Sequence, residues 1–173
     1  MLSDTCLVLG GAASGKSAFA ETLVERQDAP LVYIASAQAW DAEMRAKIDT
    51  HVARRGPRWR TVEAPLDAAA ELARLVPGEV CLFDCATMWL SNHLLAENDL
   101  EAEQARLLAA IRDCAARLVI VSNEVGFGIV PDNALARRFR EAQGRLNIAL
   151  AREAGLVVQV IAGLPQVLKG ELP

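Results

Sequence analysis

The feature that most constrains this chain is the loop at residues 10–17, whose sequence is GGAASGKS. It matches the pattern G-x-x-x-x-G-K-[ST] at every fixed position. The apolar residues 6–9 precede it, and residues 18–24, which favour a helix, follow it. A strand, a glycine-rich loop and a helix in this order direct backbone N–H groups and a helix N-terminus at an anion. We therefore predict a phosphate-binding loop, the alternative being a glycine-rich turn that binds nothing.

Two side chains of this loop are predicted to carry the chemistry. The Lys16 ammonium group would reach the β- and γ-phosphates of a nucleoside triphosphate, and the Ser17 hydroxyl would coordinate Mg²⁺. The glycines allow positive φ angles and a close approach of the backbone to the ligand. The predicted nucleotide-binding residues of the loop are Gly10, Gly11, Ala12, Ala13, Ser14, Gly15, Lys16 and Ser17.

The composition limits the classes of protein to which the chain can belong. Its 173 residues suit a single domain spanning residues 1–173, and the 53% hydrophobic content excludes a disordered chain. A net charge of −4 and an aromatic content of 5% argue against a nucleic-acid-binding surface. No apolar run approaches the roughly 20 residues needed to cross a bilayer, and no basic leader precedes Asp4. We expect a cytoplasmic protein whose four cysteines are reduced and bind no metal.

Apolar runs alternate with helix-like segments along the whole chain. Strands are predicted at residues 5–9, 31–35, 59–63, 80–84, 118–122 and 156–161. Helices are predicted at residues 16–26, 39–55, 66–75, 100–117 and 133–154, and residues 87–92 begin a helix or an irregular segment. Residues 163–165 are expected to end regular structure. This alternation predicts an α/β fold of the RecA-like P-loop NTPase type, a three-layer structure with a mostly parallel sheet flanked by helices. Ligands then collect at the carboxyl ends of the strands.

Two acidic residues follow buried strands at that edge. Asp84 closes the strand predicted at residues 80–84 and would hold Mg²⁺ together with Ser17, directly or through water. Glu124 follows the strand at residues 118–122. It could supply a second carboxylate beside the metal or a base, or it could simply cap the next turn.

The long helix predicted at residues 133–154 carries four arginines. Most charge of this kind forms a solvated helix face. One arginine could reach a phosphate, but spacing does not identify which of Arg137, Arg138, Arg140 and Arg145 it would be.

His51 is the most informative residue outside the loop. It lies on the helix predicted at residues 39–55, beside an apolar stripe, with Lys47, Arg54 and Arg55 at helical spacings from it. Nearby cations disfavour protonation of an imidazole and so leave the neutral nitrogen that a nucleophile needs. From spacing alone, a partly exposed helical histidine without a catalytic role is the competing interpretation.

Taken together, these segments resemble the bifunctional adenosylcobinamide kinase / adenosylcobinamide-phosphate guanylyltransferase family of cobalamin biosynthesis. The resemblance runs nearly end to end. It rests on GGAASGKS at residues 10–17, YIASAQAWDAEMRAKIDTHVARR at 33–55, WRTVEAP at 59–65, FDCATMWLSN at 83–92, VSNEVGFGIVPDNALARRFREAQGRLN at 121–147 and AGLPQVLK at 162–169. A phosphate-binding loop alone occurs in hundreds of kinases and NTPases. The segment with His51 and the SNEVGFGIVP segment are typical of far fewer proteins.

The resemblance implies two reactions and a set of residues. ATP or GTP would phosphorylate the aminopropanol hydroxyl of adenosylcobinamide, and GTP would then transfer GMP to a histidine, matched here by His51, and on to the new phosphate. The product would be adenosylcobinamide-GDP. Members of the family form trimers, with the nucleotide site near a subunit boundary. The further residues implied in nucleotide binding are Ala35, Ser36, Ala37, Val52, Ala53, Arg54, Arg55, Glu63 and Asp84.

Other functions remain as alternatives. A nucleotide-regulated switch would use the same loop, but the chain lacks the N-K-x-D motif of guanine-specific switches. A small-molecule kinase without transferase activity is a third candidate, against which the presence of His51 in the matching segment weighs. Ala13 stands where the family usually has arginine, so the resemblance implies altered phosphate contacts at that position.

Overall fold

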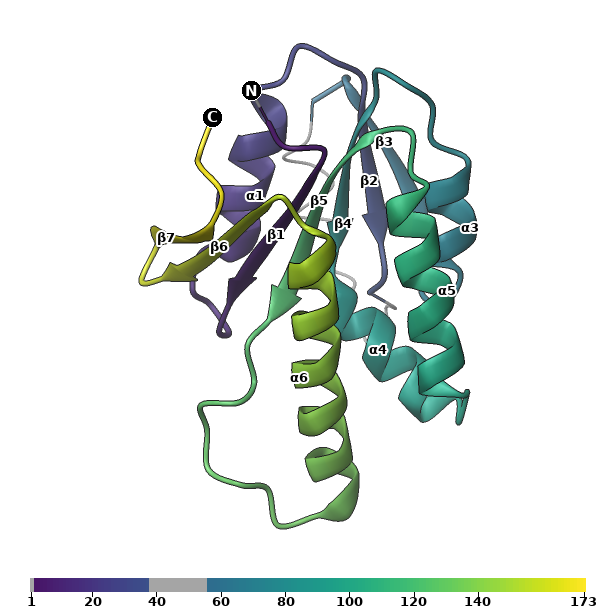
Figure 1. Ribbon diagram of the computed structural model, residues 1–173, viewed down its shortest axis with the longest axis vertical. Helices are drawn as coiled ribbons and strands as arrows, with labels where there is room; N and C mark the ends of the chain where they lie inside the picture. Colours follow the sequence, from purple (N-terminus) through teal and green to yellow (C-terminus); the bar gives the residue numbers. More distant parts are fainter. Residues whose placement is uncertain (1, 38–55) are drawn as a thin grey trace.

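The computed structural model describes residues 2–37 and 56–173, which form a seven-stranded sheet with helices on both faces (Figure 1). The strands are β1 (Thr5–Gly10), β2 (Leu31–Ala35), β3 (Trp59–Glu63), β4 (Val80–Asp84), β5 (Arg117–Asn123), β6 (Leu156–Ile161) and β7 (Leu164–Lys169). The helices are α1 (Lys16–Glu25), α3 (Ala68–Ala73), α4 (Ala86–Leu95), α5 (Leu100–Arg112) and α6 (Ala134–Glu153). The helix predicted at residues 39–55 lies outside the described residues.

The strands follow the order β3-β2-β4-β5-β1-β6-β7, and every neighbouring pair is parallel except β6 with β7. The predicted mostly parallel three-layer fold of the RecA-like P-loop NTPase type is therefore confirmed. β5 lies between β1, which leads into the phosphate-binding loop, and β4, which ends at Asp84. Because parallel strands end at one edge, the loop and Asp84 lie at the same edge of the sheet.

Each face of the sheet has its own apolar core, because the side chains of a strand alternate between the two faces. On one face, the sheet packs against α1. On the other face, it packs against α3, α4, α5 and α6, as Figure 1 shows for α5 and α6. In β5, Leu118 and Ile120 face the four helices, whereas Val119 and Val121 face α1. The same alternation fixes the direction of the side chains at the carboxyl edge.

The prediction that regular structure ends at residues 163–165 is wrong. β7 turns back and pairs antiparallel with β6 through a tight turn in which Ala162 and Gly163 have φ angles of 51° and 77°. Such a turn matches the twist of a two-residue hairpin. Pro165 suggested a break, but proline is tolerated on an edge strand, and β7 is the last strand of the sheet.

Several helix boundaries also differ from the prediction. α5 ends at Arg112 instead of residue 117, because the amide of Arg117 donates to the Glu79 carbonyl (3.2 Å) and begins β5. α3 is shorter than residues 66–75, since the Leu66 carbonyl accepts hydrogen bonds from side chains of α4. Residues 87–92, predicted to begin either a helix or an irregular segment, are helical, because they lie within α4. Within the described parts of the chain, none of the helices is long and apolar enough to cross a membrane.

Candidate active site

The phosphate-binding loop has the predicted strand–loop–helix geometry. β1 ends at Gly10, and α1 begins at Lys16, with Gly15 as its N-cap residue in the left-handed region (φ 90°). Ala13 is also left-handed (φ 54°), which is uncommon for a residue with a Cβ atom. Glycine at the N-cap has no side chain to occupy the first N–H groups of α1, so these groups can bind an anion. Lys16 Nζ donates to the Gly11 carbonyl (3.0 Å) within the same loop.

The hairpin of β6 and β7, which the sequence did not predict, packs against the phosphate-binding loop. The Gly163 amide, in the turn between β6 and β7, donates to the Ser14 carbonyl (2.8 Å). A Cβ atom at Gly15 would lie 3.2 Å from Gly163 Cα, and one at Gly10 would lie 2.8 Å from the Val160 carbonyl oxygen. The glycines of the loop are therefore required as much by this close packing as by their φ angles.

This packing predicts different effects for two adjacent glycines. Gly10→Ala should lower the free energy of unfolding by roughly 1–3 kcal/mol, because the new methyl group meets the Val160 carbonyl and the Ser14 side chain. Gly11→Ala should change it by less than about 0.5 kcal/mol, since no heavy atom lies within 4 Å of the new methyl group. Urea denaturation of both variants measures the difference. Equal stabilities would contradict the described contact of the loop with β6.

Asp84 occupies the end of β4 on the face that carries α1. The preceding alternate residues Val80 and Leu82 belong to the α1-side core, so Asp84 projects toward that side as well. The Tyr33 hydroxyl donates to Asp84 Oδ2 (3.1 Å) and orients the carboxylate. The carboxylate and the Ser17 hydroxyl are oxygen donors of the kind that Mg²⁺ prefers beside phosphates, so the donor set fits the predicted metal.

The other residues predicted to bind nucleotide follow or end β2 and β3, or lie outside the described residues. The carboxyl ends of β2, β3 and β4 lie level with one another, because Ala35 pairs with both Glu63 and Asp84. Ser36 is buried, and its hydroxyl both accepts from the Cys85 amide (2.8 Å) and donates to the Cys85 carbonyl (2.7 Å). Its side chain thus ties β2 to the end of β4. Ala37 follows it and is half-buried. The predictions for His51, Val52, Ala53, Arg54 and Arg55 fall outside the described residues.

The loop after β5 is held by one of its own side chains and by two arginines of α6. The Glu124 carboxylate accepts from the Gly126 amide, which favours the turn-capping alternative for this residue. The Arg140 guanidinium donates to the Gly126 carbonyl, and Arg137 donates to the Pro131 carbonyl (3.0 Å). These two arginines of α6 therefore stabilise the loop.

His93 is excluded as a nucleophile by its surroundings. It is buried in α4, where Asn98 Nδ2 lies 2.9 Å from its Nδ1 atom and the Leu66 carbonyl lies 3.0 Å from its Nε2 atom. The amide of Asn98 must donate to Nδ1, so Nε2 carries the proton and donates to Leu66. Both ring nitrogens are engaged, and Trp89 packs against the ring with centroids 4.5 Å apart.

The cysteines also supply no nucleophile at neutral pH. Burial raises the pKa of Cys85, the N-cap residue of α4, to about 11, and that of Cys6 to about 12. Burial likewise raises the pKa of Cys81 and Cys114 above the ordinary value. All four are free thiols, as predicted. A group with a raised pKa stays protonated at pH 7, so no thiolate is present near the loop.

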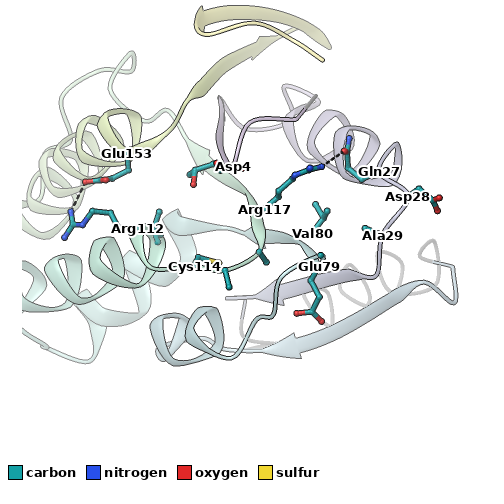
Figure 2. Close-up of a pocket in the computed structure, with 15 residues that line it drawn as sticks. Asp4, Gln27, Asp28, Ala29, Glu79, Val80, Arg112, Cys114, Arg117 and Glu153 are labelled. Atoms are coloured by element: carbon teal, nitrogen blue, oxygen red, sulfur yellow. Dashed lines mark hydrogen bonds and ion pairs between the residues drawn. The ribbon is translucent and has the colours of Figure 1, made fainter.

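A cavity of about 740 Å³ lies at the opposite, amino-terminal edge of the sheet, as Figure 2 shows. Its two arginines already have partners: Arg112 pairs with Glu153 (2.8 Å), and Arg117 donates to Gln27 (3.4 Å). The remaining charged residues of its wall are acidic. It therefore does not suit a triphosphate, and the carboxyl edge is the candidate nucleotide site.

Sequence reasoning missed a group of buried polar residues beside this edge: Thr87, Ser122, Gln143 and Asn147. Their side chains are hydrogen-bonded to one another between α4, β5 and α6. A signal was present in the sequence. Gln143 and Asn147 are polar residues four apart on a helix whose neighbouring positions Leu146 and Leu150 are core residues.

Comparisons with known proteins identify the family of the chain. A family model described as cobinamide kinase / cobinamide phosphate guanyltransferase matches residues 6–168. A Pseudomonas aeruginosa protein named bifunctional adenosylcobalamin biosynthesis protein CobP is 44% identical over 168 residues, covering 95% of this chain and 97% of that protein. The Salmonella typhimurium bifunctional adenosylcobalamin biosynthesis protein CobU is 43% identical over 176 residues, covering 91% of this chain and 96% of that protein. A solved structure of a Pyrococcus horikoshii protein shares the fold, with a TM-score of 0.54, 10% identity and coverage of 98% of this chain and 88% of that one.

Proposed function

The chain belongs to the cobinamide kinase / cobinamide phosphate guanyltransferase family, and we infer that it performs both reactions at the phosphate-binding loop. It phosphorylates adenosylcobinamide and then transfers GMP from GTP to the phosphate, in cobalamin biosynthesis. The observation that carries this conclusion is the family match over residues 6–168, which includes a loop with the geometry of a triphosphate site. A nucleotide-regulated switch, the alternative from the sequence, is not favoured by these relatives.

In the kinase reaction, the loop holds the donor triphosphate. The hydroxyl oxygen of adenosylcobinamide attacks the γ-phosphorus, the bond from that phosphorus to the β-phosphate oxygen breaks, and a nucleoside diphosphate leaves, while the hydroxyl proton passes to water. Lys16 and the N–H groups of the loop and of α1 stabilise the charge on the phosphate oxygens. Ser17 and Asp84 would hold Mg²⁺, which supplies further neutralisation of that charge when it is bound.

In the transferase reaction, we propose that a ring nitrogen of His51 attacks the α-phosphorus of GTP. The bond to the leaving pyrophosphate breaks, and Lys16 with the loop amides stabilises the charge on the departing group. A phosphate oxygen of adenosylcobinamide phosphate then attacks the guanylyl phosphorus and releases the histidine. The engagement of both His93 nitrogens supports this assignment, because His51 and His93 are the only histidines of the chain.

The remaining assignments are proposals of the same kind. We propose that residues 52–55 and Glu63 help to hold guanine nucleotide, that the enzyme is a trimer and that it works in the cytoplasm. The register that places Glu63, Ala35 and Asp84 level at one edge supports the nucleotide assignment for Glu63.

Product analysis tests the function directly. The purified chain, incubated with adenosylcobinamide and Mg²⁺ plus ATP or GTP, should yield adenosylcobinamide phosphate by mass spectrometry. With GTP the reaction should continue to adenosylcobinamide-GDP and pyrophosphate. Nucleotide hydrolysis without either corrinoid product would contradict the proposal and favour a switch. Phosphorylation without guanylyl transfer, even when adenosylcobinamide phosphate is supplied, would mean that the chain is a kinase without transferase activity.

A further inference from the structure

Side chains of α4 hold the chain segments that follow β2 and β3. These two strands stop pairing with each other at Ala35 and Glu63. Just beyond these ends, the Ser36 and Pro65 carbonyls both accept from Asn92 Nδ2, at 2.8 and 2.9 Å. Because both partners are carbonyl oxygens, the amide hydrogens of Asn92 must face them. One buried carboxamide thus cross-links the segments that leave β2 and β3.

Two further side chains of α4 support the segment after β3. Trp89 Nε1 and His93 Nε2 both donate to the Leu66 carbonyl, at 2.9 and 3.0 Å. Asn92 and His93 are three and four residues from Trp89, so the three side chains lie on one face of α4. All three are buried. This face of α4 therefore fixes residues 65–66.

Ser36 connects the same cross-link to β4. Its amide donates to the Asp84 carbonyl (3.2 Å), and its hydroxyl is hydrogen-bonded to the backbone of Cys85, the N-cap residue of α4. The ends of β2 and β4 and the start of α4 are thus joined. Asn92 adds the end of β3, which is an edge strand with β2 as its neighbour in the sheet. The position of that end therefore depends on α4 as well as on β2.

The residues proposed to hold nucleotide project from the other face of the sheet. Ala35 packs against the core on the α1 side, and its cross-strand partners Glu63 and Asp84 project to the same side. Because β2 lies between β3 and β4, these two carboxylates lie on either side of Ala35. α4 packs on the opposite face. Asn92 can therefore fix the strand ends without occupying the space in which a nucleotide would bind.

We propose that Asn92 is a positioning residue for guanine nucleotide, acting through the backbone that carries Ser36 and Glu63. It does not touch the nucleotide. By joining the ends of β2 and β3, it fixes the place of the Glu63 carboxylate relative to the rest of the carboxyl edge. The inference rests on the proposed function, in which Glu63 helps to hold guanine nucleotide.

The chemistry of Glu63 explains why recognition of the base depends on this position. A carboxylate only accepts hydrogen bonds. Guanine offers two neighbouring donors, the N1–H and the 2-amino group, whereas adenine has an unprotonated N1 and no 2-amino group. Glu63 is exposed at the end of β3. A small displacement of its carboxylate would weaken both bonds to guanine, while the phosphates would still bind the loop after β1.

The affinities of two non-hydrolysable triphosphates separate this role from a structural one. Asn92→Leu has a similar volume but no donor. It should weaken binding of GMP-PNP with Mg²⁺ by about tenfold or more and leave AMP-PNP affinity within about twofold. In the labelling of His51 by GTP, the half-saturating GTP concentration should rise, while the maximal rate should change by less than about twofold. A general loss of folded protein would instead lower the binding of both analogues alike.

Two other variants complete the test. Trp89→Phe keeps an aromatic ring but removes the bond to the Leu66 carbonyl, so it should weaken GMP-PNP binding selectively, by a smaller factor than Asn92→Leu. Ile111→Ala lowers thermal stability from the core near the amino-terminal edge and should change neither affinity below its unfolding temperature. Equal losses for both analogues in Asn92→Leu, or no loss for either, would overturn the inference. A selective loss in a chain that makes no corrinoid product would instead refute the proposed function and leave the positioning role standing.

Discussion

Replacement of Lys16 by methionine should lower the rates of both phosphorylation and guanylyl transfer by on the order of 10²–10³-fold. The methionine side chain has a similar length but no charge, so it cannot neutralise phosphate oxygens. Lys16 begins α1 and is half-buried, and its ammonium group already lies within the loop, 3.0 Å from the Gly11 carbonyl. Little rearrangement is needed for the group to turn toward a bound triphosphate.

The same loss in both reactions is the informative part of this prediction. In the kinase reaction the charge develops around the transferred γ-phosphoryl group, and in the transferase reaction it develops on the leaving pyrophosphate. Single-turnover rates for each reaction measure the two losses separately. Lys169→Met is the matched control, because Lys169 also donates to backbone carbonyls, those of Ala151 and Arg152, but on β7. A Lys16→Met variant that lost phosphorylation alone would mean that guanylyl transfer uses another phosphate site.

His51→Ala should abolish guanylyl transfer while phosphorylation survives at least in part. A nucleophile that forms a covalent intermediate has no substitute when its reacting nitrogen is removed. The γ-phosphoryl group, in contrast, passes directly to the substrate hydroxyl and needs no histidine. Intact mass after incubation with Mg²⁺ and GTP should show the gain of one GMP in the unaltered chain and none in the variant. The label from [α-³²P]GTP should be acid-labile and alkali-stable, as expected of a phosphorus–nitrogen bond.

The other histidine provides the control for this experiment. His93→Gln disturbs the buried contacts with Leu66 and Asn98 and should lower thermal stability, but it should retain the covalent label below its unfolding temperature. Loss of the label in His93→Gln with retention in His51→Ala would reverse the assignment. Complete and equal loss of both activities in His51→Ala would instead indicate a structural role for His51.

The bounds of several elements were predictable because they depend on short-range patterns. The strands at residues 31–35, 59–63, 80–84 and 156–161 have the predicted bounds, each being a compact run that closely follows a proline or a glycine. The ends of α3 and α5 were not predictable in the same way, since partners far along the chain decide them. The Leu66 carbonyl bonds to Trp89 and His93, and the Arg117 amide bonds to the Glu79 carbonyl.

The sequence by itself determined the location of the phosphate-binding loop, the Asp84 carboxylate at the end of a strand and the class of fold. These features follow from local requirements, namely glycine at fixed spacings and the periods of apolar residues along a strand or helix. The tertiary structure decided the strand order, the supporting hairpin and the arrangement of polar groups around Asn123. Thr87 and Asn147 lie 36 and 24 residues from Asn123 along the chain, and they bond to it only because β5 extends beyond β4 beside α4 and α6. Hydrogen bonds between such distant residues depend on which strands become neighbours, and no local pattern records that choice.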